Sequence, residues 1–238
     1  MGARVADLLR STWHKRGHGR SAMMLFRNRL QAARLLARRL SVYYKSKRPL
    51  VLGIPRGAVP MARVIADALG GDLDIVLVHK LSHPEQLELA IGAIDESGNA
   101  ILTDYAADLD SGYLEAEKQR QLEALRQRRA QYTPSRLPVD PYGRSVIVVD
   151  DGIATGSTMI AALRAVRAKQ PEQLVAAVAV ASPEAARAIA QEADSTFCLK
   201  VPSKFHAVGQ FFVDFAQIED EEVVLALQHG KAPASAAG

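Results

Sequence analysis

The residues best suited to chemistry lie in one run, from Val146 to Thr158. Four β-branched residues open the run, and two adjacent carboxylates, Asp150 and Asp151, follow them. A short Gly/Thr/Ser loop and a helix-like sequence come next. Backbone amides in such a loop and the positive end of a helix dipole bind phosphate. Ionised carboxylates only accept hydrogen bonds, so they suit the vicinal hydroxyls of a ribose or a hydrated magnesium ion.

An ordinary strand-to-helix turn would explain either half of this run. An Asx turn at Asp150 and Asp151 and a Ser/Thr helix cap are both common. The two halves in direct succession are much rarer, and the hydroxyls of Thr155, Ser157 and Thr158 would add to the binding of a phosphate. The run therefore predicts an anion site beside a hydroxyl-recognition site.

These thirteen residues resemble the ribose-phosphate signature of the type I phosphoribosyltransferases: four hydrophobic residues, two acids and a T-G-x-T ending. The resemblance implies that Asp150 and Asp151 bind the ribose and, through water or ribose hydroxyls, Mg²⁺. It also implies a phosphate-binding loop. The residues of that loop are Gly152, Ile153, Ala154, Thr155, Gly156, Ser157 and Thr158.

A second loop resembles the pyrophosphate loop of the same family. Leu50 to Ile54 reads as the first core strand, and a helix is expected from about Val59 to Leu69. Between them the chain reads Pro55-Arg56-Gly57-Ala58. The resemblance implies that the amides of this loop and Arg56 bind the diphosphate of phosphoribosyl pyrophosphate. Ala58 stands where relatives of this subgroup carry a second glycine.

A lysine follows the next expected strand, Asp74 to Val78. Lys80 falls where related transferases keep a lysine near the pyrophosphate; the alternative is a solvated strand end at His79 and Lys80. Residues 82–86 are polar and are expected to form a lid. Residues 87–94 and 100–102 predict an antiparallel hairpin.

The C-terminal run 202–215 holds four of the six phenylalanines. A hydrophobic edge that covers the sheet would explain it. Its order of residues also resembles, with a spacing that differs by one, the purine-binding segment of hypoxanthine-type transferases. That resemblance implies a base pocket that includes Phe205 and His206, where an aromatic ring stacks on a planar heterocycle.

Strands and helices alternate along most of the chain, which predicts an α/β fold with a central parallel sheet flanked by helices. Further strands are expected at 174–180 and 195–199, with helices at 26–44, 113–132 and from Pro183. In the first helix, Phe26, Leu30, Ala33, Leu36, Ala37, Leu40 and Tyr44 are expected to share a buried face. The family resemblance adds a small hood from the N- and C-terminal segments.

Composition limits the class of protein. The single cysteine, Cys198, excludes an intrachain disulfide framework, and its strand-like setting predicts a buried, inert thiol. No apolar run approaches the roughly 18–20 residues of a membrane span, and no signal peptide is evident, so a cytoplasmic protein is expected. The expected organisation is a basic flexible arm (1–22), a phosphoribosyltransferase-like domain (23–230) with a helical insertion at about 104–140, and a flexible tail (231–238).

Positive charge is concentrated at the N-terminus, where residues 1–48 hold 13 Lys/Arg and one acid, Asp7. Such an arm either keeps the protein soluble or binds nucleic acid. The two uses correspond to two classes of function.

The resemblance implies an enzyme that transfers a 5-phosphoribosyl group from its pyrophosphate to a nitrogenous base or related acceptor, with Mg²⁺, as a homodimer. The alternative is a regulator that senses phosphoribosyl pyrophosphate and binds nucleic acid through its basic arm. A structural module with a vestigial site is a third reading. The chain has neither the lysine of a P-loop nor a G-x-G-x-x-G after a strand, so triphosphatase and dehydrogenase classes are excluded.

Overall fold

The centre of the protein is a five-stranded parallel sheet with strand order β2-β1-β6-β7-β8. The structure of the protein is a computed structural model that describes residues 25–86, 89–134 and 136–228. The strands are β1 (Leu50–Gly53), β2 (Asp72–Ile75), β6 (Ser145–Ile153), β7 (Gln173–Ala181) and β8 (Ser195–Lys200). The predicted parallel α/β sheet is confirmed.

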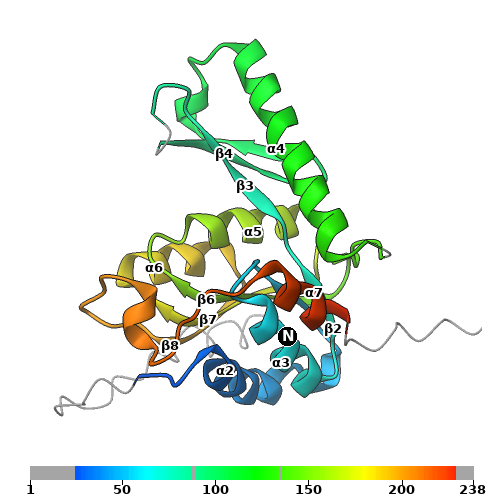
Figure 1. Cartoon of the computed structure of the whole chain (residues 1–238), viewed down its shortest axis with the longest axis vertical. Coiled ribbons are helices and arrows are strands. Elements are labelled where there is room, and N and C mark those ends of the chain that lie inside the picture. Colours follow the sequence, from blue (N-terminus) through cyan, green and yellow to red (C-terminus); the bar gives the residue numbers. More distant parts are fainter. Residues whose placement is uncertain (1–24, 87–88, 135, 229–238) are drawn as a thin grey trace, which may run out of the picture.

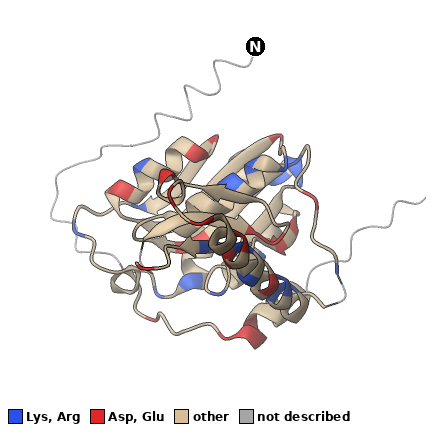
Figure 2. Ribbon diagram, turned by 90° about the horizontal axis from the view of Figure 1, so that it is seen from above, with Lys and Arg blue, Asp and Glu red and all other residues tan. Residues whose placement is uncertain are grey.

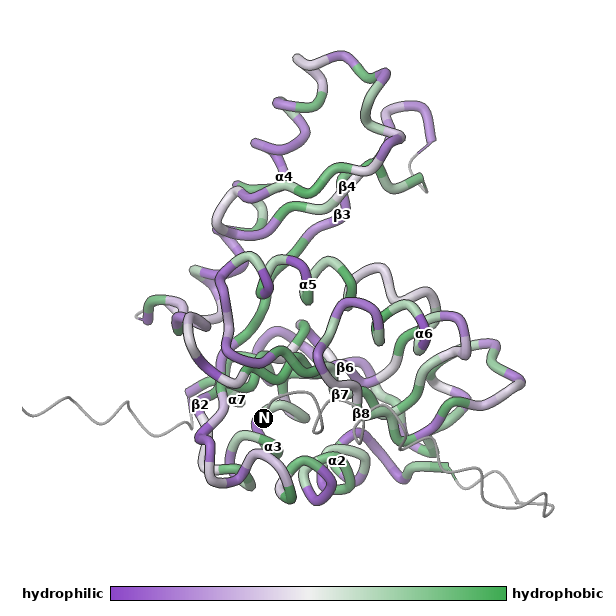
Figure 3. The backbone as a smooth tube through the Cα atoms, turned by 180° about the vertical axis from the view of Figure 1, so that it is seen from behind, coloured by the Kyte–Doolittle hydropathy of each residue, from purple (hydrophilic) through white to green (hydrophobic). Residues whose placement is uncertain are grey.

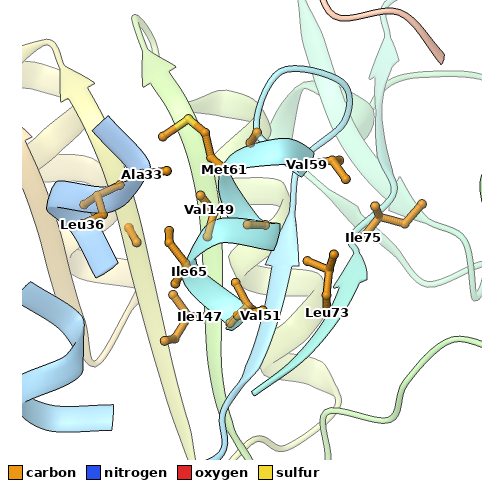
Figure 4. Packing of buried hydrophobic residues seen from close by; sticks show 14 of the residues in the cluster. Ala33, Leu36, Val51, Val59, Met61, Ile65, Leu73, Ile75, Ile147 and Val149 are labelled. Carbon is orange, nitrogen blue, oxygen red and sulfur yellow. The ribbon is translucent and has the colours of Figure 1, made fainter. Parts of the chain in front are cut away.

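Helices cover both faces of this sheet (Figure 1). α2 (Arg29–Tyr44) and α3 (Val59–Leu69) pack on one face, and α5 (Ser157–Ala168) and α6 (Pro183–Glu192) on the other. Successive side chains of a strand point to opposite faces. Ile147 and Val149 therefore pack toward α2 and α3 (Figure 4), whereas Val146 and Val148 pack against α5. Hydrophobic residues predominate in the central strands β6 and β7 (Figure 3).

A smaller antiparallel sheet projects beyond α5 together with a long helix (Figure 1). Its strands are β3 (Val78–Ser82), β4 (Ala90–Asp95) and β5 (Ala100–Leu102), and the helix is α4 (Ser111–Tyr132). The predicted hairpin is confirmed at β4 and β5, although residues 87–88 lie outside the described part of the chain. The helix falls in the expected insertion at 104–140.

Two expectations about these elements are wrong. The strand expected at 74–78 is divided, because β2 ends at Ile75 and β3 begins at Val78 in the other sheet. Val76 and Leu77 between them are both buried and continue the hydrophobic run, so the sequence pattern gives no sign of the break. Leu30, expected on the buried face of the first helix, is 40% exposed because α2 begins only one residue earlier.

The remaining described elements are short. They are the 3₁₀ turns η1 (Lys45–Lys47), η2 (Asp104–Ala106) and η3 (Val208–Phe211), and the helix α7 (Asp220–Gln228). Among the residues that the structure describes, no helix is both long and apolar enough to cross a membrane.

A buried ionic cluster joins the small sheet and α4 to the central sheet. Arg129 of α4 contacts both Asp74 of β2 (Nη1 to Oδ1, 2.8 Å) and Glu96 (Nε to Oε2, 2.6 Å). Asp74 is only 1% exposed, and it also accepts hydrogen bonds from Arg136 and from the amide of Val139. Acidic and basic residues are interspersed along α4 (Figure 2), so nothing in its sequence distinguishes Arg129 from its exposed neighbours.

We predict that Arg129→Met destabilises the protein by about 3–5 kcal/mol, because it leaves the buried carboxylates of Asp74 and Glu96 with too little positive charge. Urea denaturation measures the loss. Arg126→Met, an exposed position on the same helix, is the matched control and should change the free energy of unfolding by no more than about 0.5 kcal/mol. Equal losses in the two variants would contradict a structural role for this cluster.

Candidate functional site

The acid pair lies at the carboxyl end of β6, the central strand of the large sheet. The amide of Asp151 donates to Oδ1 of Asp150 at 2.8 Å. Gly152 follows, and a Cβ there would lie 2.3 Å from Cγ1 of Val208 in η3. The C-terminal segment can therefore approach β6 this closely only because residue 152 is glycine.

Arg29, a residue that the sequence interpretation missed, binds the acid pair. Its Nε lies 2.6 Å from Oδ2 of Asp151, and the two side chains are 12% and 13% exposed. The same guanidinium donates from Nη1 to the carbonyl of Ala216 at 2.6 Å and stacks on Phe215, with 3.7 Å between Cζ and the ring centroid. Arg29 is the first residue of α2, where a cation opposes the helix dipole. This unfavourable position was the one sequence signal that could have indicated that Arg29 has a partner elsewhere in the chain.

The expected pyrophosphate loop touches the acid pair. A Cβ at Gly57 would lie 2.3 Å from Oδ2 of Asp151 and 3.2 Å from Nε of Arg29, so the two loops are in contact through a glycine. The Pro55–Arg56 peptide is cis. Ala58 has ordinary right-handed helical angles (φ −84°, ψ −13°), so this position does not need a second glycine.

The two expected cations lie in different elements. Arg56 directs Nη1 to Oε2 of Glu219, 3.2 Å away, just before α7. Lys80 lies in β3, where it is paired with Ala93 of β4 in the small sheet. The loop residues Gly57 and Asp151 are thus brought together, whereas the side chain of Arg56 turns toward the C-terminal segment.

The expected phosphate loop connects β6 to α5. Gly156 is the N-cap of α5 with φ 82°, a left-handed conformation that favours glycine. The side chains of Thr155, Ser157 and Thr158 are exposed, and Oγ1 of Thr155 lies 3.1 Å from Oγ of Ser157. Ser182 fixes the other side of the loop by donating to the carbonyl of Ala154 at 2.7 Å. The first amides of α5 have no acceptor within the helix and are available to an anion.

The two segments expected to form the hood are hydrogen-bonded to each other. The amide of Phe26 donates to the carbonyl of Phe211, and the amide of Val213 donates to the carbonyl of Phe26, both at 2.8 Å. Of the two base-pocket candidates, Phe205 packs against Phe211 with 5.4 Å between ring centroids, and His206 is exposed. The expected arm (1–22) and tail (231–238) lie outside the described residues.

Comparison with known proteins assigns the chain to a family. The family model described as "Phosphoribosyl transferase domain" matches residues 22–216. The chain belongs to this family. Two curated Mycobacterium tuberculosis sequences that carry a provisional phosphoribosyl transferase name are each 39% identical over 219 residues, which is 91% of this chain and 49% of theirs. The chain therefore spans about half the length of the curated relatives it matches.

A solved structure supports the fold of this phosphoribosyl transferase domain. The crystal structure of TT1426 from Thermus thermophilus is 43% identical and has a TM-score of 0.78, covering 86% of this chain and 98% of that one. The predicted family and fold class are both confirmed.

The acid pair of the phosphoribosyl transferase domain is electrostatically unfavourable in isolation. Burial, and then the charge of Asp151, raise the pKa of Asp150 well above its ordinary value. Burial also raises the pKa of Asp151, while the contact with Arg29 opposes that rise. The pair therefore favours any additional positive charge that reaches it.

The lone thiol has no part in this site. Burial raises the pKa of Cys198 to about 12, and its Sγ lies 3.1 Å from the carbonyl of Lys200. A thiol with so high a pKa is inert at neutral pH, as predicted.

We predict that Asp150→Asn stabilises the protein at neutral pH and weakens ligand binding. A carboxyl group whose pKa is raised by folding stabilises the folded state only while it is protonated, so this stability is lost as the pH rises through the raised pKa. Asparagine keeps the shape and the acceptor for the Asp151 amide but carries no charge. Thermal melts across pH should show a higher Tm than the wild type at pH 7–8, and the difference should shrink at low pH. A lower Tm at pH 7–8 would mean that Asp150 is a structural turn residue.

Proposed function

We propose that this chain transfers a 5-phosphoribosyl group from phosphoribosyl pyrophosphate to a nitrogenous base or related acceptor and releases pyrophosphate. The contact between Gly57 and Asp151 carries the proposal. It sets the loop 55–58 against the acid pair, and the loop 152–158 continues directly from that pair. The diphosphate, the ribose hydroxyls and the 5-phosphate of the substrate would thus meet the loop 55–58, the acid pair and the loop 152–158, respectively. Membership of the phosphoribosyl transferase family supports this arrangement.

In this proposal each segment binds one part of the substrate. The 5-phosphate binds the amides at the start of α5 and the hydroxyls of Thr155, Ser157 and Thr158. The diphosphate binds the loop around Arg56 and Gly57, with Lys80 contributing from β3. Arg56 can turn to the diphosphate at little cost, because its pair with Glu219 is exposed (37% and 57%) and such pairs contribute about 0–1 kcal/mol.

The acid pair fits Mg²⁺. It supplies two neighbouring side chains with oxygen ligands only, and the raised pKa of both, caused first by burial, is consistent with a site that favours further positive charge. Within the described ranges no group of three or more His, Cys, Asp or Glu could hold a metal ion alone. This suits Mg²⁺, which is usually held by one or two carboxylates, with water and substrate phosphates completing its shell. The ion would neutralise charge on the leaving diphosphate.

The residues would act by positioning and by electrostatics. Bond breaking at the ribose leaves positive charge on the sugar and negative charge on the diphosphate. The carboxylates of Asp150 and Asp151 would stabilise the positive charge, and the loop amides would stabilise the negative charge, both from fixed positions. The acceptor would enter below the hood, beside Phe205 and His206. No covalent nucleophile is required.

The acceptor can be identified by incubating the protein with phosphoribosyl pyrophosphate, Mg²⁺ and one nucleobase at a time and measuring pyrophosphate release. We predict release with at least one nitrogenous acceptor. Thr155→Val should weaken substrate binding by about 1–2 kcal/mol, or roughly 5- to 30-fold, because it removes a hydrogen bond to a charged phosphate. Thr103→Val removes a hydroxyl between β5 and η2, outside the proposed site, and is the matched control.

Calorimetry measures the affinity of each variant for phosphoribosyl pyrophosphate. Equal affinities of the Thr155→Val and Thr103→Val variants would contradict the proposal that this loop binds the 5-phosphate. Thr155→Val is a cleaner probe than any change at Gly156, where a side chain would also strain the backbone at φ 82°.

A second candidate function, the nucleic-acid-binding regulator, is favoured by the outer face of α2. Arg34 and Arg38 are exposed there, as is Lys45 in the turn η1 that follows the helix, and no carboxylate in the described part of the chain pairs with them. They recur at spacings of about one and two helical turns, so they form a row along one side of the helix. Unpaired cations in a row match a phosphodiester backbone.

If this face binds nucleic acid, replacing Arg34, Arg38 and Lys45 together with glutamine should weaken binding and flatten its salt dependence. Each lost phosphate contact should lower the log–log slope by about 0.9 for duplex DNA. Filter binding at several salt concentrations measures the slope. Salt-independent or undetectable nucleic-acid binding by the wild type would rule out the regulator function and leave the transferase function as the remaining proposal.

A further inference from the structure

Arg29 joins two parts of the site that are far apart in the chain. It binds Asp151 through Nε and, through Nη1 and its flat face, the segment Phe212–Ala216, here called the C-terminal strap. The contacts to Asp151 and Ala216 bridge 122 and 187 positions of sequence. One guanidinium thus couples the charge of the acid pair to the position of the strap.

The strap is held to the start of the chain by stacked rings as well as by backbone hydrogen bonds. Phe215 stacks on Phe212 with 4.8 Å between centroids, and Phe212 lies 5.3 Å from Phe26. Lys200 contacts the ring of Phe26, with Nζ 4.3 Å from the centroid. Arg29 on Phe215 and Lys200 on Phe26 thus contact the two ends of a row of three rings, of which Phe212 and Phe215 are stacked and Phe26 and Phe212 are tilted.

The charges at the acid pair do not balance. Among the described residues Arg29 is the one cation paired with these two carboxyl groups, and it contacts Asp151 and not Asp150, so the site still attracts positive charge. A hydrated divalent cation that reaches Asp151 meets Arg29 on the same carboxylate, where the two like charges repel each other.

We propose that Arg29 is the resident counter-ion of Asp151 in the free protein, and that it leaves Asp151 when a divalent cation binds there, releasing the strap. The proposal rests on the proposed function only for its choice of cation site. It makes Arg29 a positioning residue that links occupancy of the acid pair to opening of the hood. A purely structural ion pair would instead keep Arg29 on Asp151 when a cation binds, so the strap and its hydrogen exchange would not change.

The test uses Mn²⁺ alone, with electron paramagnetic resonance reporting the free ion. Arg29→Gln should bind Mn²⁺ at least about threefold more tightly than the wild type, because a competing cation is removed. Arg27→Gln, an exposed arginine two residues earlier, changes the net charge equally and should leave the affinity unchanged. Circular dichroism checks that the variant is folded. If folded Arg29→Gln binds Mn²⁺ no more tightly than the wild type does, the proposal is overturned.

A second measurement needs no variant. Val213 and Asp214 donate their amides to the carbonyls of Phe26 and Arg27, so hydrogen exchange at 213–214 reports the strap. Mn²⁺ should accelerate this exchange in the wild type, and unchanged exchange with Mn²⁺ bound overturns the proposal. Neither measurement includes phosphoribosyl pyrophosphate. A tighter Mn²⁺ site without any transferase activity would therefore refute the proposed function and leave the counter-ion role standing.

Discussion

The site depends on two neighbouring carboxylates that a buried strand delivers to one edge of the sheet. Burial and mutual repulsion disfavour their ionised forms, which is why the pKa of Asp150 is raised well above its ordinary value. The fold supplies one compensating charge, Arg29, and brings the backbone at Gly57 against the same carboxylate. A site in this state favours a further cation beside the carboxylates, which is where the proposed function puts Mg²⁺.

Completing the site requires both ends of the domain. Arg29 comes from the first described helix, and its other partners, Phe215 and the carbonyl of Ala216, come from the strap. Gly152 admits Val208 of the same C-terminal segment against the end of β6. The C-terminal segment therefore contributes to the electrostatics of the acid pair, because its contacts fix the cation bound to Asp151.

Local patterns were enough to predict much of this. The run from Val146 to Thr158 combines a buried strand, two acids and a helix start without interruption, and the structure has β6, its loop and α5 there. The helix predicted at Val59–Leu69 has these bounds because Gly70 ends it in the left-handed conformation. Such signals lie within a few residues of the feature they predict.

Features that depend on distant partners were not predictable in the same way. The pairing of Arg29 with Asp151 joins residues 122 positions apart, and only the unfavourable place of Arg29 at a helix start marks it. Arg129 looks like any other residue of a charged helix until Asp74 and Glu96 surround it. The break between β2 and β3 is hidden because buried residues occupy both sheets and the connection between them.

The central claim is that one continuous surface, from the loop at Gly57 across the acid pair to the start of α5, binds phosphoribosyl pyrophosphate. A crystal structure of the protein with phosphoribosyl pyrophosphate and Mg²⁺ tests it most directly. We predict density for the 5-phosphate at residues 155–158, for the ribose hydroxyls at Asp150 and Asp151, and for the diphosphate at 56–58. Density for the ligand at any other surface, with the acid pair still bound by Arg29 alone, would contradict the account.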